Sequence, residues 1–141
     1  MLWLIYGAAG WLGGQCRDFL HVAGQKVVSG RRISSLKDVE DDIITHRPDR
    51  VICALGRTYG EGIPNIDYLE QPGKLKDNIR DNLLAPIYIA QATMQKSKYF
   101  PSIPTLYIGT GCIYEYDDPN DIKHICCSIN IYLLYCPVLC S

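Results

Sequence analysis

The sequence lacks an excess of charge of either sign. Its 141 residues hold 14 Lys and Arg against 15 Asp and Glu, a formal net charge of −1. Because nucleic acid-binding domains carry basic clusters, this balance argues against a nucleic acid partner. No polybasic segment marks a membrane surface, and no apolar run reaches the ~20 residues that a spanning helix needs. The length and composition predict one globular domain with a single core and no membrane partner.

The chain also lacks the even cysteine number of a disulfide framework. Its 7 cysteines are Cys16, Cys53 and Cys112 in the body and Cys126, Cys127, Cys136 and Cys140 in the tail. We therefore expect a reducing, cytoplasmic compartment. A zinc site in the tail stays an alternative, but two of its thiols are adjacent and no histidine lies at finger spacing, so the sequence predicts no metal.

Short apolar runs alternate with segments of helical periodicity. Strands are expected at 2–6, 25–29, 51–55 and 105–108, and helices at 12–23, from Ser34 or Ser35 to 46, and at 76–95. Pro86 should kink or restart the last helix, and a stretch rich in Gly, Pro and Asn predicts a long loop over 57–73. This alternation predicts βαβ units and an α/β fold with a parallel sheet.

Three glycines follow the first apolar run at a spacing of three. Gly7 allows a tight turn, Gly10 lets the backbone approach a diphosphate, and Gly13 lets a helix pack closely on the strand. The helix N-terminus would then present free N–H groups to the phosphates. The pattern favours dinucleotide binding in a Rossmann-type, doubly wound sheet. A structural turn in another α/β fold is the alternative.

The second strand ends in Gly30, Arg31 and Arg32. A site specific for NAD places Asp or Glu here to accept from the ribose 2′-OH, and this chain has no carboxylate before Asp38. Guanidinium groups suit a 2′-phosphate, which favours NADP over NAD. A solvated basic loop is the alternative.

Thr110 and Cys112 follow the strand at 105–108. Open α/β sheets place active sites at the carboxyl ends of their strands. Thr110 could donate a hydrogen bond to a substrate carbonyl, and the Cys112 thiol could move a proton. On its own, Cys112 also fits a buried, inert cysteine.

Six stretches resemble one enzyme family in the family's own order. They are 4–14, 30–31, 47–56, 64–70, 82–86 and 110–117, of which the last, Thr-Gly-Cys-Ile-Tyr-Glu-Tyr-Asp, is the most specific. The family is the extended short-chain dehydrogenase/reductases that act on nucleotide-linked 4-keto-6-deoxy sugars. The chain is similar to the UDP-4-keto-6-deoxyglucose 3,5-epimerase/4-reductases that make UDP-rhamnose, and to dTDP-4-dehydrorhamnose reductases.

The resemblance implies roles for individual residues. Those implied to bind NADP(H) are Gly7, Gly10, Trp11, Leu12, Gly13, Arg31, Arg32, Ala54, Leu55, Gly56 and Asn82. Thr110 takes the place of the active-site Ser/Thr and Cys112 that of an acid/base cysteine, while Asp67 and Glu70 lie where relatives contact the sugar. In the implied reaction the 4-keto group acidifies the C3 and C5 protons, a base and an acid epimerise these carbons, and NADPH reduces C4.

The chain departs from the family where a Tyr-x-x-x-Lys pair is needed. No tyrosine has lysine four residues on: Tyr132 is followed by Cys136 and Tyr135 by Leu139. The family's chains are also longer and carry a substrate-binding second half. We therefore expect a truncated Rossmann domain over 1–118 and a divergent, apolar, cysteine-rich tail over 119–141.

Two functional hypotheses follow. The chain is an NADP-dependent epimerase/reductase with impaired catalysis, or it is a catalytically inactive NADP-binding remnant or regulatory module. Truncation would leave the strand at 105–108 as an edge, which the tail or a second copy of the chain could cover. A homodimer is therefore possible. For the tail itself, a final strand or helix on the sheet, a membrane anchor and a stretch out of register with a longer ancestor stay open.

Overall fold

The computed structural model describes residues 1–94 and 102–109, and the backbone of 130–134. The strands are β1 (Leu2–Tyr6), β2 (Lys26–Ser29), β3 (Arg50–Cys53), β4 (Thr105–Gly109) and β5 (Asn130–Leu134). The helices are α1 (Trp11–Val22), α2 (Leu36–His46), the 3₁₀ helix η1 (Ile66–Glu70), α3 (Leu75–Asn78), the π-helix η2 (Ile79–Leu84) and α4 (Ala85–Met94). No helix among these residues is long and apolar enough to cross a membrane.

All five strands form one sheet in the order β2-β1-β3-β4-β5. The first four strands are parallel, which confirms the expected doubly wound α/β fold, and β5 runs antiparallel to β4. The expected edge at β4 is thus covered by a strand from the tail, in agreement with the final-strand interpretation. The expected domain boundary at residue 118 lies outside the described residues and stays a prediction.

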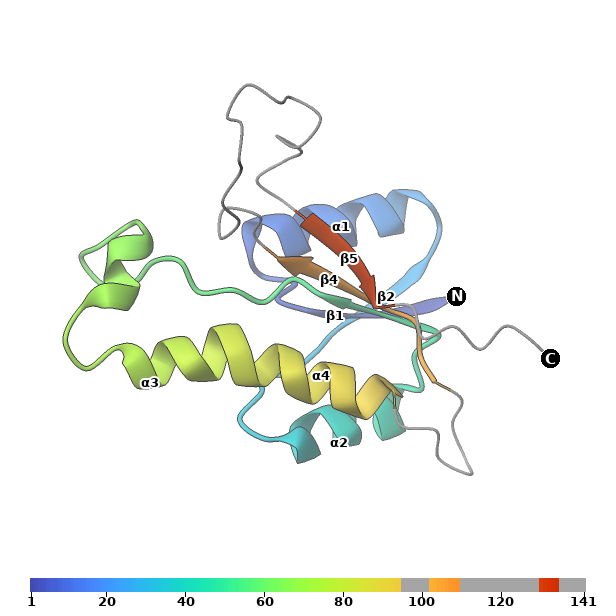
Figure 1. Cartoon of the computed structure of the whole chain (residues 1–141). Coiled ribbons are helices and arrows are strands. Elements are labelled where there is room, and N and C mark those ends of the chain that lie inside the picture. The colour runs from blue at the N-terminus through green and yellow to red at the C-terminus, as the bar shows by residue number, and fades with distance from the viewer. Residues whose placement is uncertain (95–101, 110–129, 135–141) are drawn as a thin grey trace, which may run out of the picture.

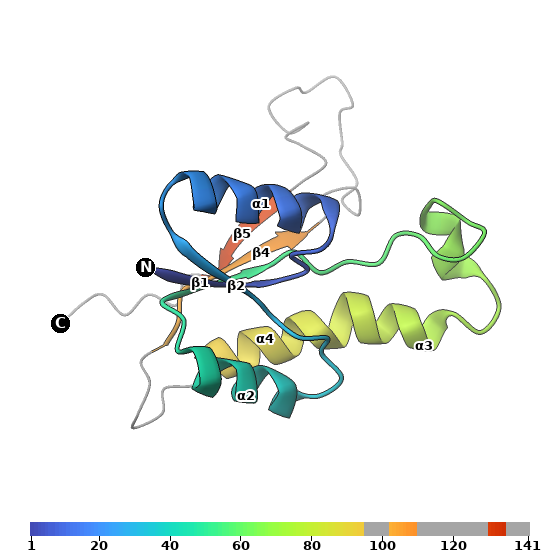
Figure 2. The same ribbon diagram turned by 180° about the vertical axis from the view of Figure 1, so that it is seen from behind.

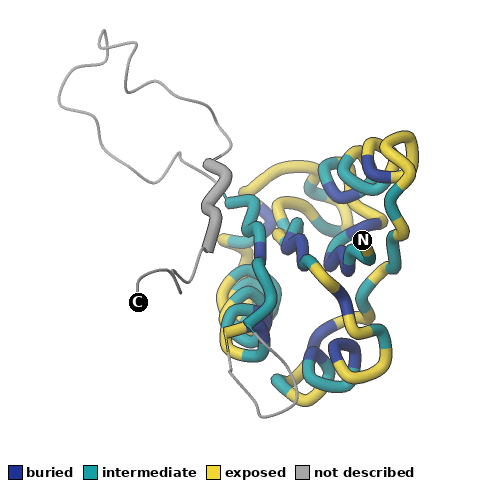
Figure 3. The backbone as a smooth tube through the Cα atoms, turned by 90° about the vertical axis from the view of Figure 1, so that its right-hand side faces the viewer, coloured by how far each residue is buried: buried dark blue, intermediate teal, exposed yellow. Residues whose placement is uncertain are grey.

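Helices cover both faces of the sheet (Figures 1 and 2). On one face α1 packs Leu20 against Ile5 and Ile52. On the other face α2 and α4 pack against the neighbouring strand positions, with Leu4, Tyr6, Val39, Val51 and Ile89 in the core. Because successive strand residues point to opposite faces, the unbroken apolar run of β1 is what a strand covered on both sides requires. Figure 3 shows buried residues along the strands and exposed ones on the outer sides of the helices.

The elements begin and end close to their expected positions. For α2 the structure decides between the two candidate caps: Ser35 is the N-cap and forms a capping box with Asp38. The Asp38 carboxylate accepts hydrogen bonds from the Ser34 and Ser35 N–H groups at 2.9 and 2.8 Å. These bonds hold the pKa of Asp38 below its ordinary value.

Pro86 perturbs the third long helix one turn earlier than its own position. The helix continues from α3 to α4, but it widens into the π-helical turn η2 directly before Pro86. A proline ring clashes with the carbonyl four residues earlier and lacks an N–H donor. A π turn, with its longer i→i+5 spacing, accommodates both effects without breaking the rod.

Candidate cofactor site

The carboxyl ends of β1, β3 and β4 lie side by side. Tyr6 is in register with Cys53, and Cys53 with Tyr107. The chain leaves β1 toward β2 on one side, whereas β3 and β4 lie on the other. Loops diverge at such a switch point, which is where open α/β sheets bind their ligands.

The turn after β1 has no room for side chains. Gly7 adopts φ +85°, and a Cβ there would lie 2.5 Å from the Ala54 carbonyl oxygen. A Cβ on Gly13 would overlap the Gly7 carbonyl group. The expected reasons for glycine at these two positions, a tight turn and close helix packing, are thus confirmed.

The N-terminus of α1 is free of side-chain caps. Gly10 is the N-cap, and the first turn contains no acidic residue. The Gly10 N–H donates to Gly7 O at 2.9 Å, which closes the turn directly before the helix. Trp11, the first helical residue, is 77% exposed. A helix end with open N–H groups and no carboxylate nearby suits a diphosphate. The backbone cradle, which a Cβ would fill, therefore fits the expected dinucleotide.

A pocket of about 600 Å³ opens between the segments that follow β2 and β3. Its lining residues are Arg32, Ile33, Leu55, Gly56, Arg57, Tyr59, Gly60, Glu61, Asp81 and Ala85. Three of them, Arg32, Leu55 and Gly56, are among the expected cofactor residues. The pocket joins the end of β2, the end of β3 and the long helix, and its apolar Leu55 and Ile33 suit an adenine ring.

Sequence reasoning missed Arg57 and Asp81 as pocket residues. The Arg57 Nε donates to the Asp81 carboxylate at 2.7 Å, and Arg80 binds the same carboxylate at 2.6 Å. The hydrogen bonds from Arg80 and Arg57 hold the pKa of Asp81 below its ordinary value. The position of Asp81 directly before Asn82, within the helix that lines the site, was the available signal.

Asn82, expected among the cofactor residues, holds the loop after β3. Its Oδ1 accepts from the Arg57 N–H at 2.6 Å, and its Nδ2 donates to the Arg57 carbonyl at 3.0 Å and to Asn78 at 2.9 Å. The amide thus pairs with both backbone groups of Arg57. Asn82 therefore shapes the pocket wall through this loop.

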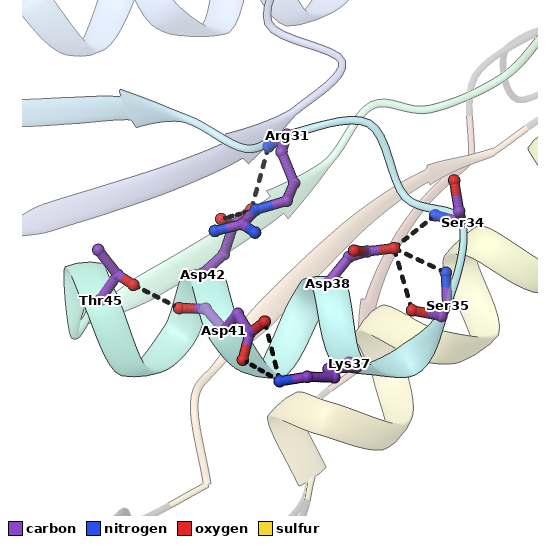
Figure 4. A network of polar contacts seen from close by, with 8 residues as sticks. All are labelled: Arg31, Ser34, Ser35, Lys37, Asp38, Asp41, Asp42 and Thr45. Carbon is purple, nitrogen blue, oxygen red and sulfur yellow. Dashed lines mark hydrogen bonds and ion pairs between the residues drawn. The ribbon is translucent and has the colours of Figure 1, made fainter.

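The two arginines after β2 lie in different surroundings. Arg31 is bound to Asp42 of α2, as Figure 4 shows, whereas Arg32 lines the pocket. Of the two, only Arg32 is among the pocket's lining residues. Which arginine contacts a 2′-phosphate stays a prediction.

None of the expected catalytic and substrate residues lines the pocket in the part of the chain that the structure describes. Thr110 and Cys112 lie outside the described residues; β4, which precedes them, ends at Gly109 at the carboxyl edge. Asp67 and Glu70 belong to the exposed η1 helix, on the arm that projects from the sheet in Figure 1. Asn65 binds the Asp67 carboxylate at 3.0 Å. Neither carboxylate lines the pocket, and their role stays a prediction.

No group of three metal-ligating side chains occurs in the part of the chain that the structure describes. Of the cysteines in that part, Cys53 is buried at the end of β3, and burial raises the pKa of its thiol to about 11. Burial also raises the pKa of Cys16. Both thiols are therefore neutral at physiological pH and unsuited to proton transfer.

Comparison with known proteins places the chain beside nucleotide-sugar enzymes. It is 43% identical to protein L780 of Acanthamoeba polyphaga mimivirus over 116 residues, which are 82% of this chain and 38% of L780. The crystal structure of L780, a UDP-rhamnose synthase, matches 88% of this chain and 42% of that one with a TM-score of 0.78 and 39% identity. No protein-family model matches the chain.

Two further relatives are more distant. The bifunctional dTDP-4-dehydrorhamnose 3,5-epimerase/dTDP-4-dehydrorhamnose reductase of Arabidopsis thaliana is 30% identical over 84% of this chain and 36% of its own length. The dTDP-4-dehydrorhamnose reductase of Bacillus anthracis, solved in complex with NADP, has a TM-score of 0.53 at 20% identity, covering 65% of this chain and 31% of that one. The latter likeness concerns the fold. The chain spans about two fifths of the length of L780 and of the Arabidopsis enzyme.

Proposed function

The chain is a homologue of the UDP-rhamnose synthase L780, as the resemblance in its sequence predicts, and we propose that it binds NADP(H) for epimerase/reductase chemistry on a nucleotide-linked 4-keto-6-deoxy sugar. The observation that carries this proposal is the glycine turn of the L780-like fold, where Gly7 and Gly13 leave a bare backbone cradle before an uncapped helix. The pocket of about 600 Å³ at the ends of β2 and β3 has the size of a small-molecule site.

The preference for NADP over NAD is supported by the end of β2. Arg31 and Arg32 stand where an NAD-specific site would hold a carboxylate. The first acidic side chains after these arginines in the sequence, Asp38 and Asp42, point back into the loop and accept its hydrogen bonds. They are therefore not available to a ribose 2′-OH.

Each part of the site would contribute one step. The turn and the first N–H groups of α1 bind the diphosphate, and the pocket wall of Leu55 and Gly56 holds the adenosine. The bound dinucleotide would supply hydride for reduction at C4 of the sugar, and the C4 oxygen would take its proton from water, since the sequence has no Tyr-x-x-x-Lys pair. Thr110 donates a hydrogen bond to the 4-keto oxygen, and Cys112 exchanges the proton at C3 or C5. Asp67 and Glu70 contact the sugar nucleotide.

The alternative is a protein that binds the cofactor without turnover. The absence of a Tyr-x-x-x-Lys pair favours it, because the family uses the tyrosine to protonate the C4 oxygen and the lysine to lower its pKa. Such a remnant would serve as a regulatory or binding module. A cytoplasmic location is proposed for either form from the cysteine pattern alone.

Turnover separates the two functions. The purified chain is mixed with NADPH and UDP-4-keto-6-deoxyglucose, and loss of NADPH absorbance and formation of the reduced sugar are followed. Turnover that disappears in both Thr110→Ala and Cys112→Ala identifies the enzyme. NADPH binding without product identifies the inactive module, and turnover unchanged in both variants contradicts the assigned roles.

We also propose that the chain forms a homodimer through the long helix. Apolar side chains at a spacing of four residues are exposed along it: Leu75, Ile79, Leu83 and Ile87. Such a stripe is typical of a helix that packs against a partner. Sedimentation should give a dimer for the wild type and a monomer for Leu83→Lys, while Val22→Lys, an equally apolar exposed position on α1, stays dimeric. A wild-type monomer at high concentration would contradict the proposal.

A further inference from the structure

A single carboxylate fixes both the backbone and the side chain of Arg31. The Arg31 N–H donates to Asp42 Oδ2 at 3.0 Å, and the Arg31 Nε donates to Asp42 Oδ1 at 2.6 Å. The Asp42 side chain is 3% exposed, whereas that of Arg31 is 46% exposed. Arg31 is therefore held through its backbone N–H and its Nε, the two contacts drawn in Figure 4, while nearly half of its side chain is exposed.

Asp42 belongs to a helix that packs against the sheet. Asp42 lies on α2 next to Ile43, which packs in the core under the sheet. The sheet side of the site adds Tyr6, whose hydroxyl is buried beside the Asp42 carboxylate. Burial and the neighbouring Asp42 carboxylate raise the pKa of Tyr6, so this phenol stays neutral and Arg31 is the cation that balances Asp42.

The rest of the loop between β2 and α2 is also fixed by hydrogen bonds. The Gly30 N–H donates to Ile5 O at 2.9 Å, and a Cβ at Gly30 would overlap the Tyr6 ring. At the other end Asp38 binds Ser34 and Ser35. The loop is thus fixed by hydrogen bonds on both sides of Arg31. The hydrogen bond to Asp42 sets the direction of the Arg31 side chain.

The pair leaves the outer part of the guanidinium open. Asp42 takes only the Nε donor, and among the described residues none forms a hydrogen bond or ion pair with the Nη1 and Nη2 of Arg31. A guanidinium presents five N–H donors in a planar fork, and the two Nη groups suit phosphate oxygens. An arginine already fixed in one rotamer also loses less conformational freedom when it binds.

We propose that Asp42 is a positioning residue for cofactor selectivity, which holds Arg31 so that its Nη groups meet a ribose 2′-phosphate. The inference rests on the proposed cofactor and deepens it, since it assigns the choice between NADPH and NADH to a pair that joins the loop after β2 to α2. A competing effect has the opposite sign, because the Asp42 charge also repels a phosphate. The two effects predict opposite results when the charge is removed.

The test compares NADPH and NADH affinities of wild type and Asp42→Asn. The asparagine amide cannot accept both Arg31 donors, so NADPH affinity should fall about tenfold, the loss of one charge-assisted hydrogen bond. NADH affinity should stay within about twofold, since the diphosphate turn is untouched. Asp41→Asn is the matched control, because it removes the exposed Lys37–Asp41 pair of the same helix and should leave both affinities unchanged.

Two more variants test whether Asp42→Asn acts on selectivity through Arg31 or only destabilises the fold. In a double-mutant cycle, Asp42→Asn should have no further effect on selectivity once Arg31 is Ala. Arg31→Lys retains the charge and leaves Asp42 bound to the backbone N–H, but it cannot bind the carboxylate and a phosphate with a fork. It should therefore lose NADPH affinity, because the fork that Asp42 holds in place is the group inferred to meet the 2′-phosphate.

The outcomes are distinct. Selectivity that is unchanged or greater in Asp42→Asn, or wild-type selectivity in Arg31→Lys, would overturn this inference while the proposed cofactor stands. A folded wild-type protein that binds neither NADPH nor NADH would overturn the proposed function, and this inference with it.

Discussion

The turn after β1 and the loop after β2 lie at the same end of the sheet but are held in opposite ways. The turn is shaped by missing side chains, since Gly7 and Gly13 let backbone touch backbone. The loop is shaped by side chains of the next helix, where Asp38 and Asp42 accept its N–H groups. The first arrangement suits a feature that every dinucleotide shares, the diphosphate. The second suits a feature that distinguishes one dinucleotide from another.

The difference also has an energetic side. A backbone-to-backbone contact leaves no space for even one methyl group, so substitution there disturbs the whole turn. A loop held by carboxylates loses one contact at a time, and each contributes on the order of 1 kcal/mol. A substitution in the turn should therefore abolish cofactor binding, whereas a substitution in the loop should weaken stability or binding only in part.

The largest effect is expected from Gly13→Ala. The added Cβ would overlap the Gly7 carbonyl, so the turn must shift. We expect the free energy of unfolding to fall by about 1–3 kcal/mol and the binding of both NADPH and NADH to be lost. Denaturant unfolding and calorimetric titration measure the two effects.

Gly14→Ala is the control for this variant. Its Cβ would meet Ala8 O at 3.7 Å, an ordinary contact, and alanine favours the helix. It should bind both cofactors normally and be as stable as the wild type or more so. Equal behaviour of the two variants would contradict the role given to the close contact at Gly13.

A smaller loss is expected from Asn82→Ala, which tests whether the loop after β3 is also held by side chains. The substitution removes the hydrogen bonds to both backbone groups of Arg57. The free energy of unfolding should fall by about 1–3 kcal/mol, since two partly buried backbone groups lose their hydrogen bonds, and both cofactors should bind more weakly. Asn78→Ala, which removes only the bond to the Asn82 amide, should cost less. Equal losses in the two variants would show that the Arg57 contact adds nothing.

Asp38→Ala should have a milder and purely structural effect. It removes the capping box of α2 but leaves the Arg31–Asp42 pair intact. The free energy of unfolding should fall by less than in the variants above, since the partly exposed Asp38 carboxylate is one half of the capping box. The ratio of NADPH to NADH affinity should not change. A change in this ratio would mean that selectivity belongs to the whole loop and not to the Arg31–Asp42 pair.

The smallest effect concerns pH. In the folded protein the pKa of Asp38 lies below its ordinary value of 3.8, because Ser34 and Ser35 donate to the carboxylate. The stability that it adds is therefore present above about pH 4 and lost as pH falls through the lower, folded value. Thermal unfolding followed from pH 7 to pH 3 should show a shallower decline for Asp38→Ala than for the wild type. Parallel curves would show that the capping box does not contribute to the acid sensitivity.

The features that could be predicted from the sequence are those that depend only on residues close together in the chain. The apolar run of β1, the glycine spacing and the helical periodicity of α2 each lie within one short segment, so they predicted the fold and the turn. A kink or a restart of the helix was expected at Pro86. The structure has a π turn over Ile79–Leu84, after which α4 begins at Ala85.

The features that were missed depend on partners far apart in the sequence. Asp42 lies eleven residues from Arg31, and Asn82 lies 25 residues from Arg57. Neither pair has a local pattern, because the contact exists only after α2 and the long helix pack on the same face of the sheet. The antiparallel direction of β5 is likewise set by its pairing with β4, and the apolar tail gave no periodic signal for it.

Calorimetric titration of the folded wild-type chain with NADPH, and separately with NADH, tests the central claim most directly. We expect saturable binding of one NADPH per chain and weaker binding of NADH, because the turn accepts the diphosphate of both and the loop after β2 favours the 2′-phosphate. Properly folded protein that takes up neither dinucleotide would contradict the claim that the turn from Gly7 to Gly13 holds a diphosphate.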